Sequence, residues 1–310
     1  MIWRIAGSLG LVAGSLSVGY WLGRTGRLRE STASRIVAWL MIGTSPLILC
    51  FSMWRMNLRS FEPWLLPFIA VALSAAALLP AFLYARADRL TPARTGSFLT
   101  CAFFSNVGYF GSFAAFAVFG EQAYALCQMY LAFFTPSFYT LGFWMASHYG
   151  HKPSQAGRSS AFGGEIRFFP LIGMAAGIGL SFLAVPRPEI LSRFNSLLIP
   201  VDTAGCLIAI GSQMSVAVSW KEHGRPGAAM CLIKFLYTPL IAWAAVALFG
   251  LSGLTRKVVL LESAMPVGVS PLLLPLLFGL DRRLSHALWW ITTVVGLAVI
   301  VAALWLLVSQ

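Results

Sequence analysis

Two stretches of the sequence combine polar side chains with residues that interrupt a helix. One runs from Ser105 to Ser112 and includes Asn106, and the other runs from Glu262 to Gly268. Glycine loosens a helix, and the proline of the second stretch removes a backbone donor and clashes with the preceding turn. Half-helices that begin at such breaks present N–H groups without partners, which favour an anion and in particular a carboxylate. Carbonyl groups freed at the opposing ends favour a cation or a proton-carrying group.

We therefore expect the two breaks to form one anion-binding site. Irregular backbone at membrane depth survives only where it faces protein or water, and two breaks at corresponding positions of a chain indicate a transporter's binding site. The expected contact residues are Ser105, Asn106, Val107, Gly108, Gly111, Met265, Pro266, Val267 and Gly268. The alternative is a pair of ordinary kinks, since Pro and Gly are frequent in membrane helices.

Charged and polar groups inside apolar stretches are further candidates. Glu262 lies about one turn before the proline, and a charge at mid-bilayer costs about 2.5–3.5 kcal/mol on insertion scales. We expect Glu262 to face a cavity and to couple transport to a proton or sodium; a structural salt bridge is the alternative. Asp202, Gln213 and Lys234 rank lower. Asp202 could simply start a helix, and Lys234 could extend to the cytoplasm, pair with an acid or attract an anion.

The elements that position these residues follow from the composition. The chain has 310 residues, of which 58% are hydrophobic and only 10% are charged, too few to cover a soluble surface. This composition indicates a bilayer as solvent and excludes disorder, a disulfide scaffold and a secreted enzyme. The net charge of +12 comes from Lys and Arg in short segments between apolar runs, which is a topology signal and not a nucleic-acid footprint.

Long apolar runs predict an all-α membrane protein with ten spans, each of about 20 residues. They cover residues 4–23, 33–54, 62–84, 95–119, 122–147, 166–185, 194–219, 226–250, 256–279 and 285–308. A polar connection, 148–165, separates a first five-span repeat, 1–147, from a second, 166–310. Five spans per half place the halves in opposite orientations, an inverted repeat typical of secondary transporters. The two interrupted stretches then belong to the fourth and ninth spans.

The distribution of basic residues predicts the orientation. The odd-numbered connections hold roughly twice as many Lys and Arg as the even-numbered connections and the N-terminus together. The positive-inside rule therefore places the odd connections, including the 148–165 linker, in the cytoplasm. Both termini are expected outside, on the periplasmic face of an inner or plasma membrane.

No motif indicates a cofactor, a metal or an enzyme. The cysteines lie inside apolar stretches without a CxxC pair, and the histidines lie near span ends without metal-ligand spacing. HExxH, GxSxG, P-loop and Rossmann patterns are absent from the sequence. We therefore expect no cofactor and no metal.

Several motifs together resemble the auxin efflux carrier family, which includes plant auxin exporters and bacterial malonate or dicarboxylate transporters. The first is Phe104-Ser-Asn-Val-Gly-Tyr-Phe-Gly111, followed by Phe119-Gly-Glu121. The others are Phe134-Thr-Pro-Ser-Phe-Tyr-Thr-Leu-Gly142, Lys234 with Pro239, and Leu261-Glu-Ser-Ala-Met-Pro266. The similarity extends over nearly the whole chain and is sharp around these motifs.

The resemblance implies ten helices in two inverted five-helix repeats, with helices four and nine broken and crossing at mid-membrane. It implies transport of a small organic anion by an elevator-like movement between a scaffold and a transport domain, and a homodimer would suit it. One departure is that the family has proline soon after the second glycine of the fourth-helix motif, where this chain has Ser112-Phe113.

Bile-acid sodium symporters share this architecture and are more distantly similar. Ser105-Asn106, Thr135 and Glu262-Ser-Ala-Met265 resemble their sodium-coordinating segments, which makes Thr135 and Asn106 further ion-coupling candidates beside Glu262. Where those symporters have Gln-Asn after the methionine, this chain has Pro266-Val267.

The sequence thus predicts a secondary transporter of a small organic anion, most plausibly a carboxylate. Asn106, Gly108 and Pro266 would form the substrate site, and Glu262 would be the coupling group. A sodium-coupled symporter of the bile-acid type is the nearest alternative. A non-transporting membrane receptor or scaffold and a membrane-embedded enzyme are the others, and the scattered Ser, His and Asp residues argue against the enzyme.

Overall fold

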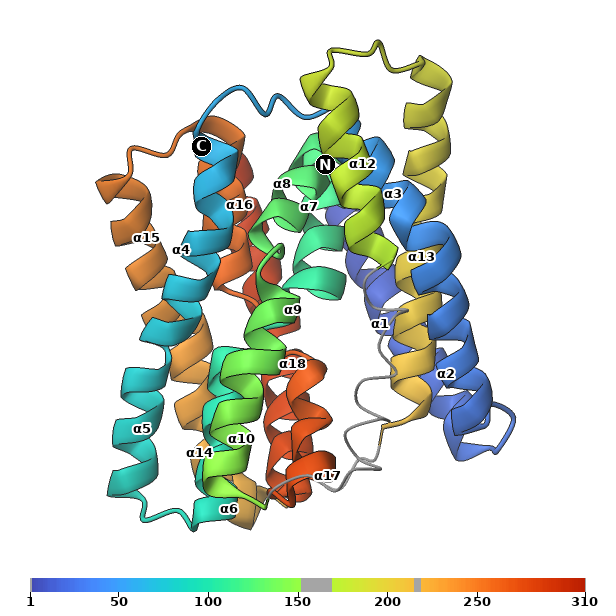
Figure 1. Ribbon diagram of the computed structural model, residues 1–310. Coiled ribbons are helices and arrows are strands. Elements are labelled where there is room, and N and C mark those ends of the chain that lie inside the picture. The colour runs from blue at the N-terminus through green and yellow to red at the C-terminus, as the bar shows by residue number, and fades with distance from the viewer. Residues whose placement is uncertain (1, 152–168, 215–218, 310) are drawn as a thin grey trace. The chain divides into compact units, whose positions relative to one another are not determined.

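A computed structural model describes residues 2–151, 169–214 and 219–309, and this part of the chain is helical and contains no strand (Figure 1). Five helical runs in it are long and apolar enough to cross a membrane: Glu30–Trp54, Glu62–Ala87, Glu189–Ser212, Trp220–Leu248 and Arg282–Val308. Two shorter apolar helices are Val107–Phe119 and Phe169–Phe182. The all-α class is confirmed for the described residues and is consistent with a membrane protein, and the inverted repeat of ten spans stays a prediction.

The contacts divide the chain into two compact units, and each unit takes residues from both halves of the sequence. Unit 1 contains the described residues within 1–64, 108–129 and 162–214. Unit 2 contains those within 65–107, 130–161 and 215–310.

Unit 1 is built mainly from four long helical segments. Its elements are α1 (Ile2–Arg24), α2 (Glu30–Trp39), η1 (Leu40–Thr44), α3 (Ser45–Trp54), η2 (Val107–Gly111), α7 (Ser112–Phe119), α8 (Glu121–Tyr130), α12 (Phe169–Phe182) and α13 (Glu189–Ser212). The π-helical turn η1 joins α2 and α3 into one run. Helix α1 packs along α13, and α3 packs along α12, as Figure 1 shows.

Glycines allow these helix pairs to approach backbone to backbone. A Cβ atom at Gly19 of α1 would lie 2.2 Å from the carbonyl oxygen of Ile208 in α13. One at Gly23 would lie 2.1 Å from that of Ser212. Since real Cβ atoms do not approach other atoms so closely, any larger residue must push the helices apart. Small residues spaced by four are a recognised means of close helix packing in membranes.

The pair α3–α12 repeats this arrangement. A Cβ atom at Gly173 of α12 would lie 2.1 Å from the carbonyl oxygen of Pro46 in α3, and one at Gly177 would lie 2.3 Å from that of Cys50. The two glycines are again four residues apart, and so are their partners. The first helix of each sequence half therefore contacts the second helix of the other half through the same pattern.

We expect Gly177→Ala to destabilise unit 1. The new methyl group meets backbone that cannot rotate away, and overpacking of this kind costs about 1–3 kcal/mol. Gly179→Ala in the same helix is the matched control, because a Cβ atom there meets nothing within 4 Å. The melting temperatures of the two purified variants measure the effect; equal melting temperatures would contradict the close packing.

One end of unit 1 is held together by a buried polar cluster around Glu121, at the start of α8. The Glu121 carboxylate accepts hydrogen bonds from Arg187 Nη2 at 2.8 Å and from Asn195 Nδ2 at 2.5 Å. Arg55 Nη1 lies 3.8 Å from the same carboxylate, and Asn195 also donates to Ser52 Oγ at 2.9 Å. The connections after α3, α7 and α12 therefore meet at this end, which we call the Glu121 cluster.

Unit 2 contains the whole second interrupted stretch and residues 105–107 of the first, whereas residues 108–112 belong to unit 1. Its elements are α4 (Glu62–Ala76), α5 (Leu78–Ala87), α6 (Pro92–Phe103), α9 (Phe134–Ser137), η3 (Phe138–Gly142), α10 (Phe143–Tyr149), α14 (Trp220–Leu232), η5 (Ile233–Tyr237), α15 (Thr238–Leu248), α16 (Gly253–Ser263), η6 (Ser270–Leu272), α17 (Leu274–Phe278) and α18 (Arg282–Ser309). Helix α18 contacts α6, α14 and α16, and α10 contacts α6 and α17.

Both predicted breaks are present. Helix α6 ends at Phe103, Phe104 is extended, and helical structure resumes at Val107. Helix α16 ends at Ser263, and the next helical turn, η6, begins at Ser270.

Four connections meet at one end of unit 2. Arg94, at the start of α6, lies 4.0 Å from a carboxylate oxygen of Glu222 and 3.8 Å from one of Asp281. The backbone N–H of His151 donates to the carbonyl of Phe278 at 2.7 Å. These contacts join the connection after α5, the chain after α10, the start of α14 and the connection before α18.

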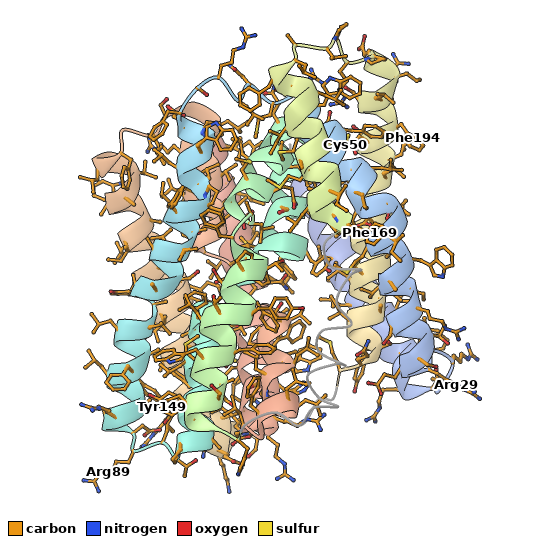
Figure 2. All side chains as sticks on the ribbon, viewed as in Figure 1. Arg29, Cys50, Arg89, Tyr149, Phe169 and Phe194 are labelled. Carbon is orange, nitrogen blue, oxygen red and sulfur yellow. The ribbon has the colours of Figure 1, made fainter. Side chains whose placement is uncertain are left out.

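Figure 2 shows Arg89 and Tyr149 at this same end of unit 2. Arg89 follows α5, and Tyr149 ends α10. Residues 152–165 of the predicted 148–165 connection lie outside the described residues, as do 166–168 and 215–218 of the predicted sixth and seventh spans.

The fifth span differs from the continuous helix predicted over 122–147. A turn at residues 131–133 separates α8 from α9, and η3 adds a π-helical turn before α10. The apolar run around this turn contains no Gly or Pro before Pro136, so hydropathy alone could not distinguish the turn from helix.

Candidate functional site

The two breaks lie against each other as a short antiparallel pair in unit 2. Ser105 and Val267 face each other in an isolated β-bridge. The N–H of Asn106 donates to the carbonyl of Pro266 at 2.8 Å, and the N–H of Gly268 donates to that of Phe104 at 2.9 Å. We call this pairing of residues 104–106 with 266–268 the crossover.

A glycine is required at position 268 because the strands approach so closely. A Cβ atom there would lie 2.8 Å from the carbonyl oxygen of Ser105 and 3.4 Å from that of Phe104.

The crossover uses backbone donors that we expected to be free. Besides the N–H groups of Asn106 and Gly268, the N–H of Val267 donates to Thr292 Oγ1 of α18 at 3.1 Å. These three N–H groups are therefore not open to an anion in this arrangement, because each already has a protein acceptor. An anion here must be recognised by side chains or by other amides.

The side chain of Asn106 supplies one such donor. It is buried, with 4% of its surface exposed, and its Nδ2 has no hydrogen-bond partner among the described residues. A buried amide without an acceptor costs about 1–3 kcal/mol, so an acceptor that arrives from outside the chain would recover that cost.

The ammonium group of Lys234 lies beside the crossover. Its Nζ donates to the carbonyl of Ala102, in the last turn of α6, at 2.6 Å and to Ser105 Oγ at 2.8 Å. Only 1% of the residue is exposed. The possibility that Lys234 extends to the aqueous face is therefore wrong, because its charged end is hydrogen-bonded inside unit 2.

Lys234, Ser105 and Ala102 line a cavity of about 40 Å³ in unit 2. Its polar lining residues are Ser74, Ser105, Tyr130, Ser137, Lys234, Thr238, Glu262 and Ser263. Aromatic and aliphatic side chains from α4, α6, α8 and α9 complete the wall. The space has room for about three water molecules or a carboxylate group, and a larger organic anion requires it to open.

Glu262 contributes to this wall from the last turn of α16, and 1% of the residue is exposed. The structure thus brings Glu262, Lys234 and Ser105 to one cavity, beside the crossover of Pro266 and Val267. Apart from Val107, the other candidates in unit 2 do not line it. Thr135 lies half-buried in α9, and the fully buried Met265 lies next to the crossover, which contains Asn106, Pro266, Val267 and Gly268.

The remaining predicted residues belong elsewhere. Val107 lines the cavity, but Gly108 and Gly111, in η2, are part of unit 1. Gln213 ends α13 in unit 1, is exposed, and donates to the carbonyl of Ala209 at 3.5 Å.

Asp202 is buried within α13 and does not start a helix, because that helix begins thirteen residues earlier, at Glu189. Its carboxylate accepts hydrogen bonds from Thr44 Oγ1 and from Ser45 Oγ, the latter at 3.0 Å. Both hydroxyl groups lie where η1 passes into α3. Asp202 therefore joins two long helices of unit 1 through side-chain hydrogen bonds.

Five Ser and Thr residues of the site were not predicted. Thr292 accepts the Val267 amide, and Ser74, Ser137, Thr238 and Ser263 line the cavity. Each is a single hydroxyl in an apolar helix, where such residues usually bond to their own backbone. The adjacent pair Thr292-Thr293 was the strongest available signal.

Apolar spans and a crossover of two broken segments beside a buried cation are typical of integral membrane transporters. Comparison with known proteins agrees with that class. The model of a family described as "membrane transport protein" matches residues 159–306. An uncharacterized transporter of Methanocaldococcus jannaschii is 24% identical over 233 residues, 71% of each chain. One of Methanothermobacter thermautotrophicus is 23% identical over 281 residues, 89% of this chain and 88% of the relative.

Over residues 159–306 the chain is therefore similar to the membrane transport protein family, which includes the auxin efflux carriers. The resemblance drawn from the sequence motifs is confirmed. The family is one of transporters and not of enzymes.

Proposed function

We propose that this protein is a secondary transporter of a small organic anion that carries a carboxylate. The observation that carries the proposal is the buried Nδ2 of Asn106, at the crossover of two broken helices, for which the described part of the chain supplies no acceptor. A carboxylate oxygen is a suitable acceptor for this donor. The ammonium of Lys234, which is hydrogen-bonded to the neighbouring residue Ser105, adds a positive charge that favours an anion. Discontinuous helices are where secondary transporters bind their cargo.

We further propose that the chain has ten spans in two inverted five-helix repeats, 1–147 and 166–310, joined by the linker 148–165. The glycine contacts of α1 with α13 and of α12 with α3 support this arrangement. In each pair the first helix of one half packs on the second helix of the other half, as expected when the two halves are related by symmetry. The ends of the units also support it. Connections after even-numbered spans meet at the Glu121 cluster, and those after odd-numbered spans meet around Arg94.

The proposed mechanism is an elevator movement, in which unit 2 carries the bound anion and unit 1 is the scaffold. Two features support it. The crossover, Lys234 and Glu262 all belong to unit 2, and the helices of unit 1 are packed through glycines without room to slide. A homodimer through unit 1 would hold the scaffold still. We propose that the end of unit 2 around Arg94 is cytoplasmic and that both termini are periplasmic, because basic residues concentrate in the odd connections.

Uptake into proteoliposomes tests this function. Purified protein should accumulate at least one of radiolabelled malonate, succinate and indole-3-acetate above protein-free vesicles, with saturation. Proton and sodium gradients imposed in turn identify the driving ion, with Glu262 as the candidate coupling group. If folded protein moves none of the three carboxylates in any gradient, the proposed substrate class is wrong.

We expect Asn106→Ala and Glu262→Gln each to reduce that uptake. Loss of a hydrogen bond to a charged group costs about 1.5 kcal/mol, which corresponds to roughly a tenfold fall in substrate affinity. Asn57→Ala and Glu189→Gln are the matched controls, since both residues are exposed in unit 1. Both site variants should still insert into the membrane. Wild-type rates in both would remove these residues from the site.

A further inference from the structure

The ammonium of Lys234 is held by neutral oxygens. Its two hydrogen bonds go to the Ala102 carbonyl and the Ser105 hydroxyl, and no ion pair with an acidic side chain is found for it among the described residues. A buried ammonium is costly unless its donors are satisfied and a favourable field surrounds it. The source of that field is the helix that ends beside it.

Ala102 lies in the last turn of α6, where carbonyl groups lose their partners because the helix breaks at Phe104. The C-terminal end of a helix carries a partial negative charge, and such ends attract cations. The hydroxyl of Ser105 extends this set of oxygens from the break itself. The wall of the same cavity adds the Glu262 carboxylate and the Thr238 hydroxyl.

Carbonyl, hydroxyl and carboxylate oxygens at a half-helix C-terminus are the groups with which transporters coordinate sodium. Lys234 reaches them from η5, a different helix, and places its Nζ 2.6 Å and 2.8 Å from two of them. A sodium ion could not bind those two oxygens while the ammonium is there. The site therefore contains its own cation, covalently attached to the chain.

We propose that Lys234 takes the place of a coupling sodium ion at the crossover, so that the protein binds its anion without sodium. The fixed ammonium donates hydrogen bonds to the Ala102 carbonyl and the Ser105 hydroxyl and offsets the partial negative charge of the helix end throughout the cycle. The consequence for transport rests on the proposed function, but the occupancy of the cation site does not.

The experiment measures the melting temperature of the purified protein in sodium chloride and in choline chloride at equal concentration. Wild type should melt at the same temperature in both salts. Lys234→Ala should be less stable in choline, and sodium should raise its melting temperature by about 2–4 °C, because an ion that binds only the folded state stabilises it. Lys234→Arg retains the charge and should show no sodium response.

A second substitution identifies the ligands. In Lys234→Ala/Ser105→Ala one oxygen is lost, and the sodium response of the single variant should fall by at least half. Lys234→Ala/Ser147→Ala is the matched control, because Ser147 Oγ bonds only its own helix, at Trp144. A sodium-dependent melting temperature in wild type would overturn the proposal, and so would a folded Lys234→Ala variant without a sodium response. The wild-type comparison can refute the proposal even if that variant does not fold.

Uptake separates this inference from the proposed function. Wild-type uptake of the transported carboxylate should be equal with sodium or choline on both sides of the vesicle. Uptake that requires sodium refutes the role of Lys234 and leaves the transporter intact. If no carboxylate is moved in either salt, the proposed function fails, and the melting temperatures still decide whether Lys234 occupies a cation site.

Discussion

Replacing Gly268 by alanine is expected to abolish transport, with a fall in rate on the order of 100-fold. The new methyl group would lie 2.8 Å from the Ser105 carbonyl oxygen, which is backbone and cannot rotate away. The two strands of the crossover must separate, and the hydrogen bonds from Asn106 and Gly268 weaken together. Displacing positioned groups by about 1 Å costs this much in other active sites.

Gly224→Ala is the control for this prediction. Gly224 is in the same unit, in helix α14, and a Cβ atom there meets nothing within 4 Å. Initial uptake rates are compared after the amounts of folded protein have been equalised by size-exclusion chromatography. Transport by Gly268→Ala at the Gly224→Ala rate would show that the crossover tolerates separation and does not form the substrate site.

Arg187→Met is expected to destabilise unit 1 by about 3–5 kcal/mol, the cost of leaving one member of a buried ion pair without its partner. Arg187 and Glu121 expose 6% and 8% of their side chains, and Arg187 also donates to the carbonyl of Phe51 at 2.7 Å. Thermal unfolding in detergent should show a large fall in melting temperature.

Arg55→Met tests whether burial is the reason. Arg55 contacts the same Glu121 carboxylate at 3.8 Å, but 53% of its side chain is exposed, and exposed pairs contribute about 0–1 kcal/mol. Its melting temperature should remain near that of wild type. Comparable losses in the two variants would mean that charge, and not burial, determines the stability of the Glu121 cluster. In Arg187→Met/Glu121→Leu part of the lost stability should return.

The positions of the breaks could be predicted because their causes are local. Pro266 and Gly268 forbid or weaken helix wherever they occur, and polar Asn106 before Gly108 does the same in the other half. That the two breaks belong together followed from their corresponding positions in the halves. The structure confirms that both occur and that they contact each other.

The use of the backbone at the crossover could not be predicted. The amides of Asn106, Val267 and Gly268 could face an anion or a protein acceptor. Which of these occurs depends on the register between two segments more than 150 residues apart in the sequence. Sequence spacing carries no information on that register. The direction of the Lys234 side chain could not be predicted either. A lysine at this position of the sequence is compatible both with extension toward water and with the hydrogen bond to Ala102 that the structure shows.

Buried polar clusters were also beyond the sequence. Glu121 and Arg187 each read as an ordinary charge at the end of a span, and only packing brings them within 2.8 Å. The turn at residues 131–133 had no Gly or Pro to mark it. Both are outcomes of tertiary contacts that overrule local preference.

The crossover is held by main-chain atoms. Its hydrogen bonds between residues 104–106 and 266–268 do not use the side chains at positions 105, 106 and 267, whereas position 268 requires glycine. Geometry and cargo choice are thus encoded in different atoms of the same six residues. Relatives could exchange the side chains at positions 105, 106 and 267 and acquire a new cargo while the frame of the pocket is inherited unchanged. Diversification of substrates within one architecture needs no more than that freedom.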